Sequence, residues 1–451
     1  MDKNYTEVFA DTLYTLANKT PPAEVLSEAR KCLLDGIASM LGGADAMREK
    51  IEAYLLQQPP CPEGATVVNL QRKASLQNAA LCNALSLHAF DMDDGHRFST
   101  VHLAATVIPA VLAVAEYHDL SMDDLLRGIL IGYEAGIRMG HCIQPSHRNR
   151  GFHASGTVGT LGAAMGVAAA LRLTKDEFKA TLSAAATSAA GLGEAFENVS
   201  TLKPFNAARA CQDGVTAALI AKTGFVGPHD MLGGTFSFFR AMCETCDPTV
   251  LDLEVDPNWN ILGCYHKIYA SCRHTHAPMD GAIAIAKEHK PNPKQIKAVK
   301  VTMYGQGIKG HSYTDISSTT AGKMSIPYCM GLSLVHKEGG ISAFTEEAIR
   351  DEDVLRICKC TTVVEDPEMT KAVPSKRPAH VTVEMKDGTV FEKQVDYALG
   401  EPENPLSMEG FLAKFRDLAS YGGKSDAEIT ALADFILHHE GPVRELTARI
   451  Q

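Results

Sequence analysis

Hydrophobic residues recur at helical spacing through most of the first 263 residues of the chain. Over residues 25–41 they follow at every third or fourth position, after Pro21-Pro22, which suits a first helical turn. We predict that this helix ends at Gly42-Gly43, since glycine is a common helix stop. The same spacing predicts further helices over residues 75–89, 103–117 (with Pro109 as a kink or restart), 121–140, 155–170, 174–190, 207–222, 407–420 and 425–439.

Local signals refine three of these helices. Ser121-x-x-Asp124 and Thr174-x-x-Glu177 have the spacing of capping boxes, which predicts a helix start at each. Glycines recur at every third or fourth position between Gly156 and Gly166, and such a series superficially suggests a phosphate-binding loop. No strand precedes it and no Gly-Lys-Ser/Thr follows. We therefore expect these small residues to let helices pack closely inside a buried bundle.

The pattern changes after residue 264. Residues 298–304 and 379–385 alternate between apolar and polar positions, which is typical of half-buried strands, and Asp387-Gly388 predicts a hairpin to the run 389–392. Helical patterns over 278–289, 325–336 and 345–357 lie between them, so an antiparallel α+β arrangement is expected. We predict a mainly α protein in which a large all-helical domain, residues 1–263 plus 398–451, carries an inserted smaller α+β domain, residues 264–397.

Composition narrows the classes of function. The chain has 43 Lys and Arg against 54 Asp and Glu, a net charge of −11, which disfavours nucleic-acid binding because phosphate neutralisation needs clustered cations. The first twenty residues lack the basic and apolar segments of a signal peptide, and no stretch has the ~18 apolar residues of a membrane span. We expect a soluble, cytoplasmic protein with reduced cysteines. Cys243-x-x-Cys246 and Cys358-x-Cys360 are interpreted as packing residues rather than a zinc site.

Two polar clusters of the helical region are candidates for chemistry. Arg148 and Arg150 precede His153 at the start of the Gly-rich helix, where the helix dipole favours a neutral imidazole suited to acid–base work. The other cluster lies at the end of the predicted helix 75–89. Negative charge is disfavoured at a helix C-terminus, so its density favours a functional role over a solvated loop. It holds three carboxylates and three histidines within fifteen residues: His88, Asp91, Asp93, Asp94, His96 and His102.

Two further clusters are rich in cations. Lys203 precedes Pro204 near the N-terminus of the predicted helix 207–222, where a cation is unfavourable unless it is solvated or held for a ligand. Residues 266–276 hold five groups that can be cationic: His266, Lys267, Arg273, His274 and His276. This density at the predicted domain boundary suggests recognition of a carboxylate or phosphate, and Arg273 could clamp a carboxylate through two hydrogen bonds.

The four clusters together suit removal of a proton alpha to a carboxylate. They lack the order of a Ser-His-Asp triad and a nucleotide-binding loop, which disfavours acyl and phosphoryl transfer. The carbanion next to a carboxylate is high in energy, so preorganised cations must stabilise its charge. A small polyanionic substrate would explain why cations gather in an acidic protein.

Short motifs also follow one another in a specific order along nearly the whole chain. They are Ala89-Phe-Asp-Met-Asp-Asp94 with Val101-His102, Gly132-Tyr-Glu134, Gly151-Phe-His-Ala-Ser-Gly-Thr-Val-Gly159, Lys203-Pro-Phe-Asn-Ala-Ala-Arg209, Gly224-Phe225 and Lys267-Ile-Tyr-Ala-Ser-Cys-Arg-His-Thr-His276. In this order they resemble the MmgE/PrpD superfamily, which includes 2-methylcitrate dehydratase, cis-aconitate decarboxylase and iminodisuccinate epimerase. The resemblance implies a helical domain with a smaller α+β lid domain, usually in a homodimer.

The resemblance further implies an active site lined by Asp91, His102, His153, Lys203 and Lys267. In the decarboxylase branch a histidine follows the last lysine by five positions, and this sequence has Cys272 there. The departure argues against cis-aconitate decarboxylation, and the run Ser271 to His276 is more similar to the epimerase and uncharacterised branches.

We therefore hypothesise a metal-independent and cofactor-independent lyase or isomerase acting on a small di- or tricarboxylate, either 2-methylcitrate dehydratase-like or iminodisuccinate epimerase-like. His102 or His153 removes the alpha proton, with Asp91 orienting a histidine. Lys203 and Lys267 stabilise the resulting enolate.

The distal carboxylate of the substrate is expected to bind to Cys272, Arg273 and His274.

Two alternatives stay open. The cluster at 88–102 could instead bind a metal in a hydrolase with a His/Asp centre, since imidazole and carboxylate ligands suit Mn, Fe or Zn. The chain could also be a non-catalytic helical scaffold.

Overall fold

The computed structural model describes residues 3–196 and 200–451. Two compact units make up the chain. The first unit comprises Met1–Ala89, Asp93–Cys264 and Met408–Gln451, and the second comprises Phe90–Met92 and Tyr265–Ser407. Within the described part of the chain, each helix is too short or too polar to cross a bilayer.

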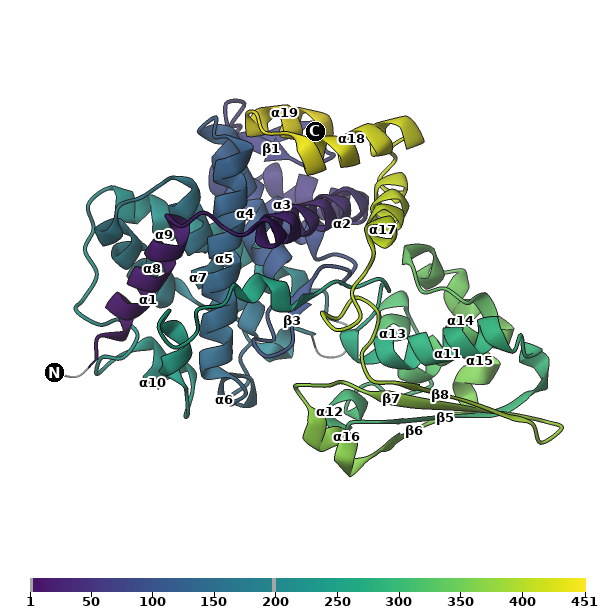
Figure 1. Ribbon diagram of the computed structural model, residues 1–451. Coiled ribbons are helices and arrows are strands. Elements are labelled where there is room, and N and C mark those ends of the chain that lie inside the picture. The colour runs from purple at the N-terminus through teal and green to yellow at the C-terminus, as the bar shows by residue number, and fades with distance from the viewer. Residues whose placement is uncertain (1–2, 197–199) are drawn as a thin grey trace. The chain divides into compact units, whose positions relative to one another are not determined.

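The first unit is built mainly of helices (Figure 1). They are α1 (Tyr5–Ala17), α2 (Ala23–Leu55), α3 (Leu76–Leu87), α4 (Leu103–Tyr117), α5 (Met122–Ile143), α6 (Ser146–Asn149), α7 (Ala154–Ala170), α8 (Lys175–Ser188), α9 (Lys203–Lys222), α10 (Phe238–Met242), α17 (Met408–Tyr421), α18 (Asp426–His438) and α19 (Val443–Ile450). Short 3-10 helices and strands accompany them: η1 (Gly193–Phe196), η2 (Pro248–Leu251), η3 (Asn260–Gly263), β1 (Ala65–Val67), β2 (Arg72–Ala74) and β3 (Gly95–His96). The mainly α class is confirmed.

The glycine series forms the centre of the first unit. Every residue of α7 is buried, and α7 packs against α4, α5, α8 and α9. A Cβ at Gly162 would meet the carbonyl oxygen of Gly132 on α5 at 3.0 Å, and one at Gly166 would meet that of Gly128 at 2.8 Å. The two helix backbones therefore approach closely because neither carries a side chain at the contact. Close helix packing is confirmed as the role of these glycines.

The starts of α5 and α8 are also as predicted. Ser121 with Asp124, and Thr174 with Glu177, form complete capping boxes, in which each side chain accepts from the backbone N–H of the other position. The helix 103–117 forms with the predicted bounds as α4 and continues through Pro109.

The predicted stop at Gly42-Gly43 is wrong, because α2 continues to Leu55. A Cβ at Gly42 would lie 3.0 Å from the carbonyl oxygen of Leu418 on α17, and one at Gly43 only 1.8 Å from that of Ser86 on α3. These glycines let α2 cross two other helices. The packing energy of that crossing outweighs the weak helix propensity of glycine.

The second unit contains a four-stranded sheet covered by helices (Figure 1). Its elements are η4 (Arg273–Thr275), α11 (His276–Glu288), η5 (Pro293–Gln295), β5 (Ile296–Met303), α12 (Gly305–Ile308), α13 (Thr319–Met324), α14 (Ile326–His336), η6 (Ile341–Phe344), η7 (Ala348–Arg350), α15 (Glu352–Lys359), β6 (Thr361–Glu365), α16 (Pro367–Ala372), β7 (Ala379–Met385) and β8 (Val390–Val395). The short strand β4 (Cys264–Tyr265) lies at the unit boundary. Figure 1 shows α11, α14 and α15 on the same face of the sheet.

The strand order is β6-β5-β7-β8. β7 and β8 form the predicted hairpin, with Gly388 at φ 88°, and β7 alternates between buried and half-buried positions. The expectation of an antiparallel sheet is wrong for one pair, because β6 lies parallel to β5, Val301 facing Val363. The predicted helix 345–357 is also interrupted. Asp351 accepts from the N–H groups of Asp353 and Val354, so α15 begins after it.

Candidate functional site

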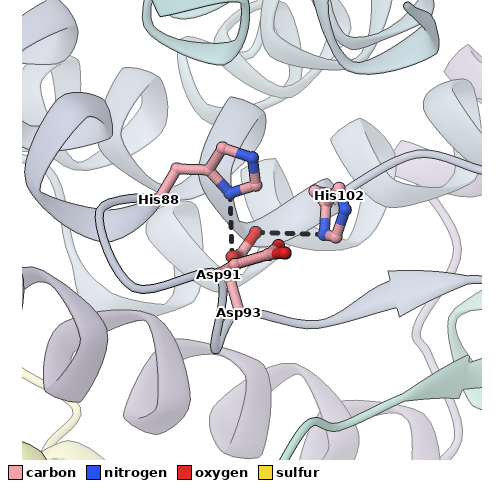
Figure 2. A group of neighbouring side chains, drawn as sticks. All are labelled: His88, Asp91, Asp93 and His102. Carbon is pink, nitrogen blue, oxygen red and sulfur yellow. Dashed lines mark hydrogen bonds and ion pairs between the residues drawn. The ribbon is translucent and has the colours of Figure 1, made fainter. Parts of the chain in front are cut away.

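A buried carboxylate lies between two histidines of the first unit (Figure 2). His88 directly follows α3 and His102 directly precedes α4. Asp93 Oδ1 is 2.8 Å from His88 Nδ1, and its Oδ2 is 3.3 Å from His102 Nδ1. Burial alone would raise the pKa of Asp93, but the two imidazoles hold that pKa well below its usual 3.8. The carboxylate is therefore an anion that holds both rings.

A backbone carbonyl fixes the tautomer of His102. Its Nδ1 lies 2.9 Å from the carbonyl oxygen of Asp94, which can only accept a hydrogen bond. Nδ1 consequently carries a proton, and Asp93 lies on the same side of the ring. A neutral His102 then has its lone pair on Nε2, as a general base requires.

Asp94 also anchors the helix that positions His102. Its Oδ1 accepts from the N–H of Ala104 in the first turn of α4 at 2.9 Å, which supplies the cap that the His102 side chain does not. Tyr133 of α5 donates to Asp94 Oδ2 at 2.5 Å. The His102 N–H donates to Ser155 Oγ of α7 at 3.2 Å. Three helices therefore fix the position of this imidazole.

His153 precedes α7, as predicted. Its Nδ1 faces a hydrogen-bond donor, whereas the Nδ1 of His102 faces an acceptor. Asn206 Nδ2 donates to the carbonyl of Leu192 at 3.1 Å, which settles the orientation of the amide. The same Nδ2 is 2.9 Å from His153 Nδ1, so this ring nitrogen accepts. A neutral His153 has its proton on Nε2 and can donate a hydrogen bond from there.

Lys203 is the first residue of α9, and its side chain is half-buried. Leu202 occupies the N-cap position, and Asn206 follows Lys203 within the first turn. Lys203 and the residue that orients His153 therefore share one helix start. The arginines that precede His153, Arg148 and Arg150, are exposed.

In the second unit, Asp91 pairs with Lys267. Lys267 Nζ donates to Asp91 Oδ1 at 2.7 Å and to its backbone carbonyl at 2.8 Å, and the lysine is 1% exposed. Asp91 has φ 56°, a left-handed conformation that Asp tolerates better than most residues. The ammonium group holds both the backbone and the side chain of Asp91 in that conformation.

Arg273 is engaged within the second unit. Its Nε and Nη2 donate to Glu401 Oε1 at 3.1 and 2.7 Å, and its guanidinium lies 4.5 Å from the centre of the Tyr265 ring. Its Nη1 donates to His276 Nδ1 at 3.0 Å. Burial, together with the charges of Arg273 and Lys267, holds the pKa of His276 well below 6.5, so this imidazole is neutral.

The neighbours of Arg273 each contact a ring. His274 Nδ1 is 2.7 Å from the Tyr304 hydroxyl, and Cys272 Sγ is 3.4 Å from His311 Nε2. The His102 N–H donates to Ser155, which follows His153 by two residues, so the two histidines lie at neighbouring helix starts. Asp91 pairs with Lys267.

The roles of several residues in these networks were not predicted. Asp93 belongs to the recognised motif, but the sequence alone does not distinguish it from Asp91. Asn206 lies in the Lys203 motif, and the need to orient His153 could have identified it. Glu401 and His311 lie 128 and 39 residues from their partners, so no local pattern indicates them.

Comparison with known proteins agrees with these motifs. Residues 7–251 match the MmgE/PrpD N-terminal domain, and residues 269–436 match the MmgE/PrpD C-terminal domain. Cis-aconitate decarboxylase of Aspergillus terreus is 26% identical over 448 residues, which cover 94% of this chain and 90% of that protein. The proteins of the same name from Mus musculus and Homo sapiens are each 24% identical, over 93% of this chain and 88% and 89% of their own length. The chain belongs to the MmgE/PrpD family.

Proposed function

We propose that the chain is a metal-independent lyase or isomerase that removes a proton alpha to a carboxylate of a small di- or tricarboxylate. The observation that carries this proposal is the tautomer of His102, which has its Nδ1 proton directed at Asp94 and Asp93. A base for carbon acids needs one such oriented lone pair at a fixed position.

In the proposed reaction, His102 Nε2 takes the proton from the alpha carbon. The ring becomes an imidazolium, and the buried anion Asp93 stabilises the new positive charge. Asp93 is better suited to this task than an exposed carboxylate, because a charge pair is less screened where water is excluded.

We propose that His153 stabilises the negative charge that develops on the substrate. Its Nε2–H would donate to a carboxylate oxygen of the substrate as the enolate develops. Lys203 adds a positive charge that stabilises the same carboxylate of the substrate. The first turn of α9 supplies Lys203 and orients His153 through Asn206, so the positions of the two groups are fixed relative to each other.

We propose that Lys267 is the second cation and the candidate proton donor, with Asp91 holding its ammonium group. His274 would contact a distal carboxylate. Arg273, whose charge Glu401 balances, would hold this segment in position.

The enolate can expel a beta hydroxide to give an alkene, or it can take a proton on its other face. In a decarboxylation the same enolate would arise by loss of carbon dioxide instead of a proton. Relatives named cis-aconitate decarboxylase support a lyase acting on a small carboxylate, but their identity of 24–26% does not carry the substrate across. We propose a 2-methylcitrate-like hydroxy acid and iminodisuccinate as the first substrates to test, beside cis-aconitate.

Solvent exchange tests the proposal whichever of the three products forms. Candidate polycarboxylates are incubated with the protein in D₂O, and NMR measures deuterium at the alpha carbon and any new species. We expect exchange or turnover with at least one acid, and a loss of about 10²-fold or more in Lys203→Ala and Lys267→Ala. Lys386→Ala, in the exposed hairpin turn, is the matched control. Unchanged exchange in both site variants would refute the lysine assignment.

One observation favours the alternative of a metal-dependent hydrolase. His88, Asp93 and His102 each offer a ligand atom, and these atoms lie within 4.8 Å of one another. The nitrogens that face Asp93 are both Nδ1, and His102 Nδ1 carries a proton, which a metal would have to displace. Elemental analysis of the purified protein decides between the two: a stoichiometric metal with activity that a chelator abolishes would favour the hydrolase.

We also propose a homodimer, as the family resemblance implies. Large apolar side chains are exposed near the start of α9: Leu192 is 62% exposed, Leu202 57% and Phe205 44%. Exposed apolar groups that gather in this way often mark subunit interfaces. Light scattering coupled to gel filtration should give twice the chain mass of 48.5 kDa, and a single-chain mass would contradict the proposal.

A further inference from the structure

Cys272 lies beside an oriented imidazole of the second unit. Its Sγ is 3.4 Å from His311 Nε2, and His311 Nδ1 is 2.8 Å from the carbonyl oxygen of Lys309. A carbonyl only accepts, so Nδ1 carries a proton and Nε2 can take the proton of the thiol. A nucleophile, a base that faces it and a third group that orients the base are the parts of an activated thiol.

The charges around Cys272 favour the thiolate. Burial alone would raise the pKa of the Cys272 thiol, but the hydrogen bond with His311 and the positive charge of that ring outweigh it, so the pKa lies below the ordinary 9.0. The charge of Asp91 acts in the opposite direction, and the backbone N–H of His274 helps to lower the value.

Three other ionisable groups of the second unit that lie near the pair are neutral at neutral pH. Burial raises the pKa of Tyr304 and of Cys329, and it raises that of Tyr313 to about 12, so all three are neutral. The ring of His274 lies edge-on to that of His311, with centroids 5.2 Å apart. The Cys272 N–H donates to the carbonyl of Lys323 at 3.0 Å, which fixes the backbone at the thiol.

Other cysteines of the chain provide a contrast. Burial raises the pKa of Cys82 and of Cys358 to about 12, so those thiols are protonated and inert. Cys272 is half-buried, whereas Cys82 and Cys358 are buried. Cys246 is exposed and Cys61 is half-buried, so these two serve as internal references for accessibility.

We propose that Cys272 and His311 form a thiolate–imidazolium pair, and that this pair makes Cys272 a modification site at which a peroxide oxidises the chain. The thiolate sulfur attacks one peroxide oxygen, an S–O bond forms and the O–O bond breaks. Sulfur is oxidised by two electrons to a sulfenic acid, and the peroxide is reduced to hydroxide, which takes the imidazolium proton of His311 to give water. The step does not depend on the proposed lyase or isomerase activity.

Chemical labelling tests the site. The wild-type protein and His311→Gln are treated with hydrogen peroxide in the presence of dimedone, which traps sulfenic acids, and mass spectrometry follows each cysteine. We expect Cys272 in the wild type to be labelled about tenfold faster than Cys246 and Cys61, and the advantage to vanish in His311→Gln. Faster labelling of either reference cysteine, or an unchanged rate in the variant, would overturn the proposal.

A second measurement needs no variant and covers the case in which His311→Gln does not fold. The rate of Cys272 alkylation by iodoacetamide is followed in the wild type from pH 6 to 10 by peptide mass spectrometry. Only the thiolate reacts, so the rate rises through the pKa of the thiol. A midpoint below 9.0 is expected, and a midpoint at or above 9.0 contradicts the ion pair.

Discussion

His102 and His153 occupy equivalent positions in the fold and have opposite hydrogen-bonding roles. Each precedes a buried helix as its N-cap residue, and neither caps its helix with its own side chain. The Nδ1 of His102 faces a carbonyl and a carboxylate, whereas the Nδ1 of His153 faces the N–H of an amide. One ring therefore presents a lone pair on Nε2 and the other an N–H.

This contrast shows that the neighbour, rather than the helix position, decides what an imidazole can do. The helix dipole acts on both rings in the same sense and cannot distinguish them. The sequence leaves the choice of base open, because the residues that decide it, Asp94 and Asn206, act through the folded structure. The proposal that His102 is the base and His153 the donor rests on these contacts.

The largest expected effect comes from removing the base. Glutamine matches the imidazole in size and can donate a hydrogen bond, but it cannot accept a proton from carbon. His102→Gln should lower kcat for the best polycarboxylate by about 10³-fold. Steady-state kinetics checks this value, with the exposed His438→Gln as control. A loss of less than tenfold would exclude His102 as the base.

The same substitution at the second histidine should have a smaller effect. The amide of His153→Gln can replace the Nε2–H donor, so we expect a loss of about tenfold, whereas His153→Ala removes the donor and should lose about 10²-fold. The comparison of glutamine with alanine is the readout. If His153→Gln were as inactive as His102→Gln, the assigned roles would not hold.

Breaking the network behind His102 should affect stability. Asp93→Asn removes the anion that holds two imidazoles in a fully buried position, and we expect the free energy of unfolding to fall by about 2 kcal/mol. Urea denaturation at pH 7 measures it. Asp434→Asn, at an exposed carboxylate of α18, should leave it unchanged. Equal stability of Asp93→Asn and the wild type would refute a structural role for this carboxylate.

The smallest effect is the pH dependence of that difference. The pKa of Asp93 is lowered in the folded state, so its contribution to stability is complete above the unfolded value of about 3.9 and is lost as the pH falls through the folded value. The stability gap between wild type and Asp93→Asn should therefore shrink as the pH falls below about 4. A gap that grows as the pH falls from about 4 would have the wrong sign.

Sequence patterns predict most of the helices because their signals are local. The capping boxes at Ser121 and Thr174 and the hairpin at Asp387-Gly388 depend on residues within a few positions of each other. The continuation of α2 through Gly42-Gly43 depends on α3 and α17, which lie elsewhere in the chain. Strand β6 had a local signal, four β-branched residues from Thr361 to Val364, but its parallel pairing with β5 did not.

The same distinction between local signals and long-range contacts applies to the candidate site. Clusters of His, Asp, Lys and Arg indicate where a functional site lies, since such a density of ionisable groups favours a functional role. They do not indicate which member performs which task. Asp93 and Asp91 are two residues apart, yet one holds imidazoles and the other holds Lys267. Only the fold, which brings Asp94 to His102 and Asn206 to His153, separates base from donor.

The tautomers themselves provide the most direct test. Histidine is labelled with ¹⁵N in the wild type and, for assignment, in His102→Gln and His153→Gln, and two-bond ¹⁵N–¹H correlations are recorded at a pH at which the rings are neutral. We expect His102 to carry its proton on Nδ1 and His153 to carry it on Nε2. The same tautomer at both positions, or the reverse assignment, would contradict it.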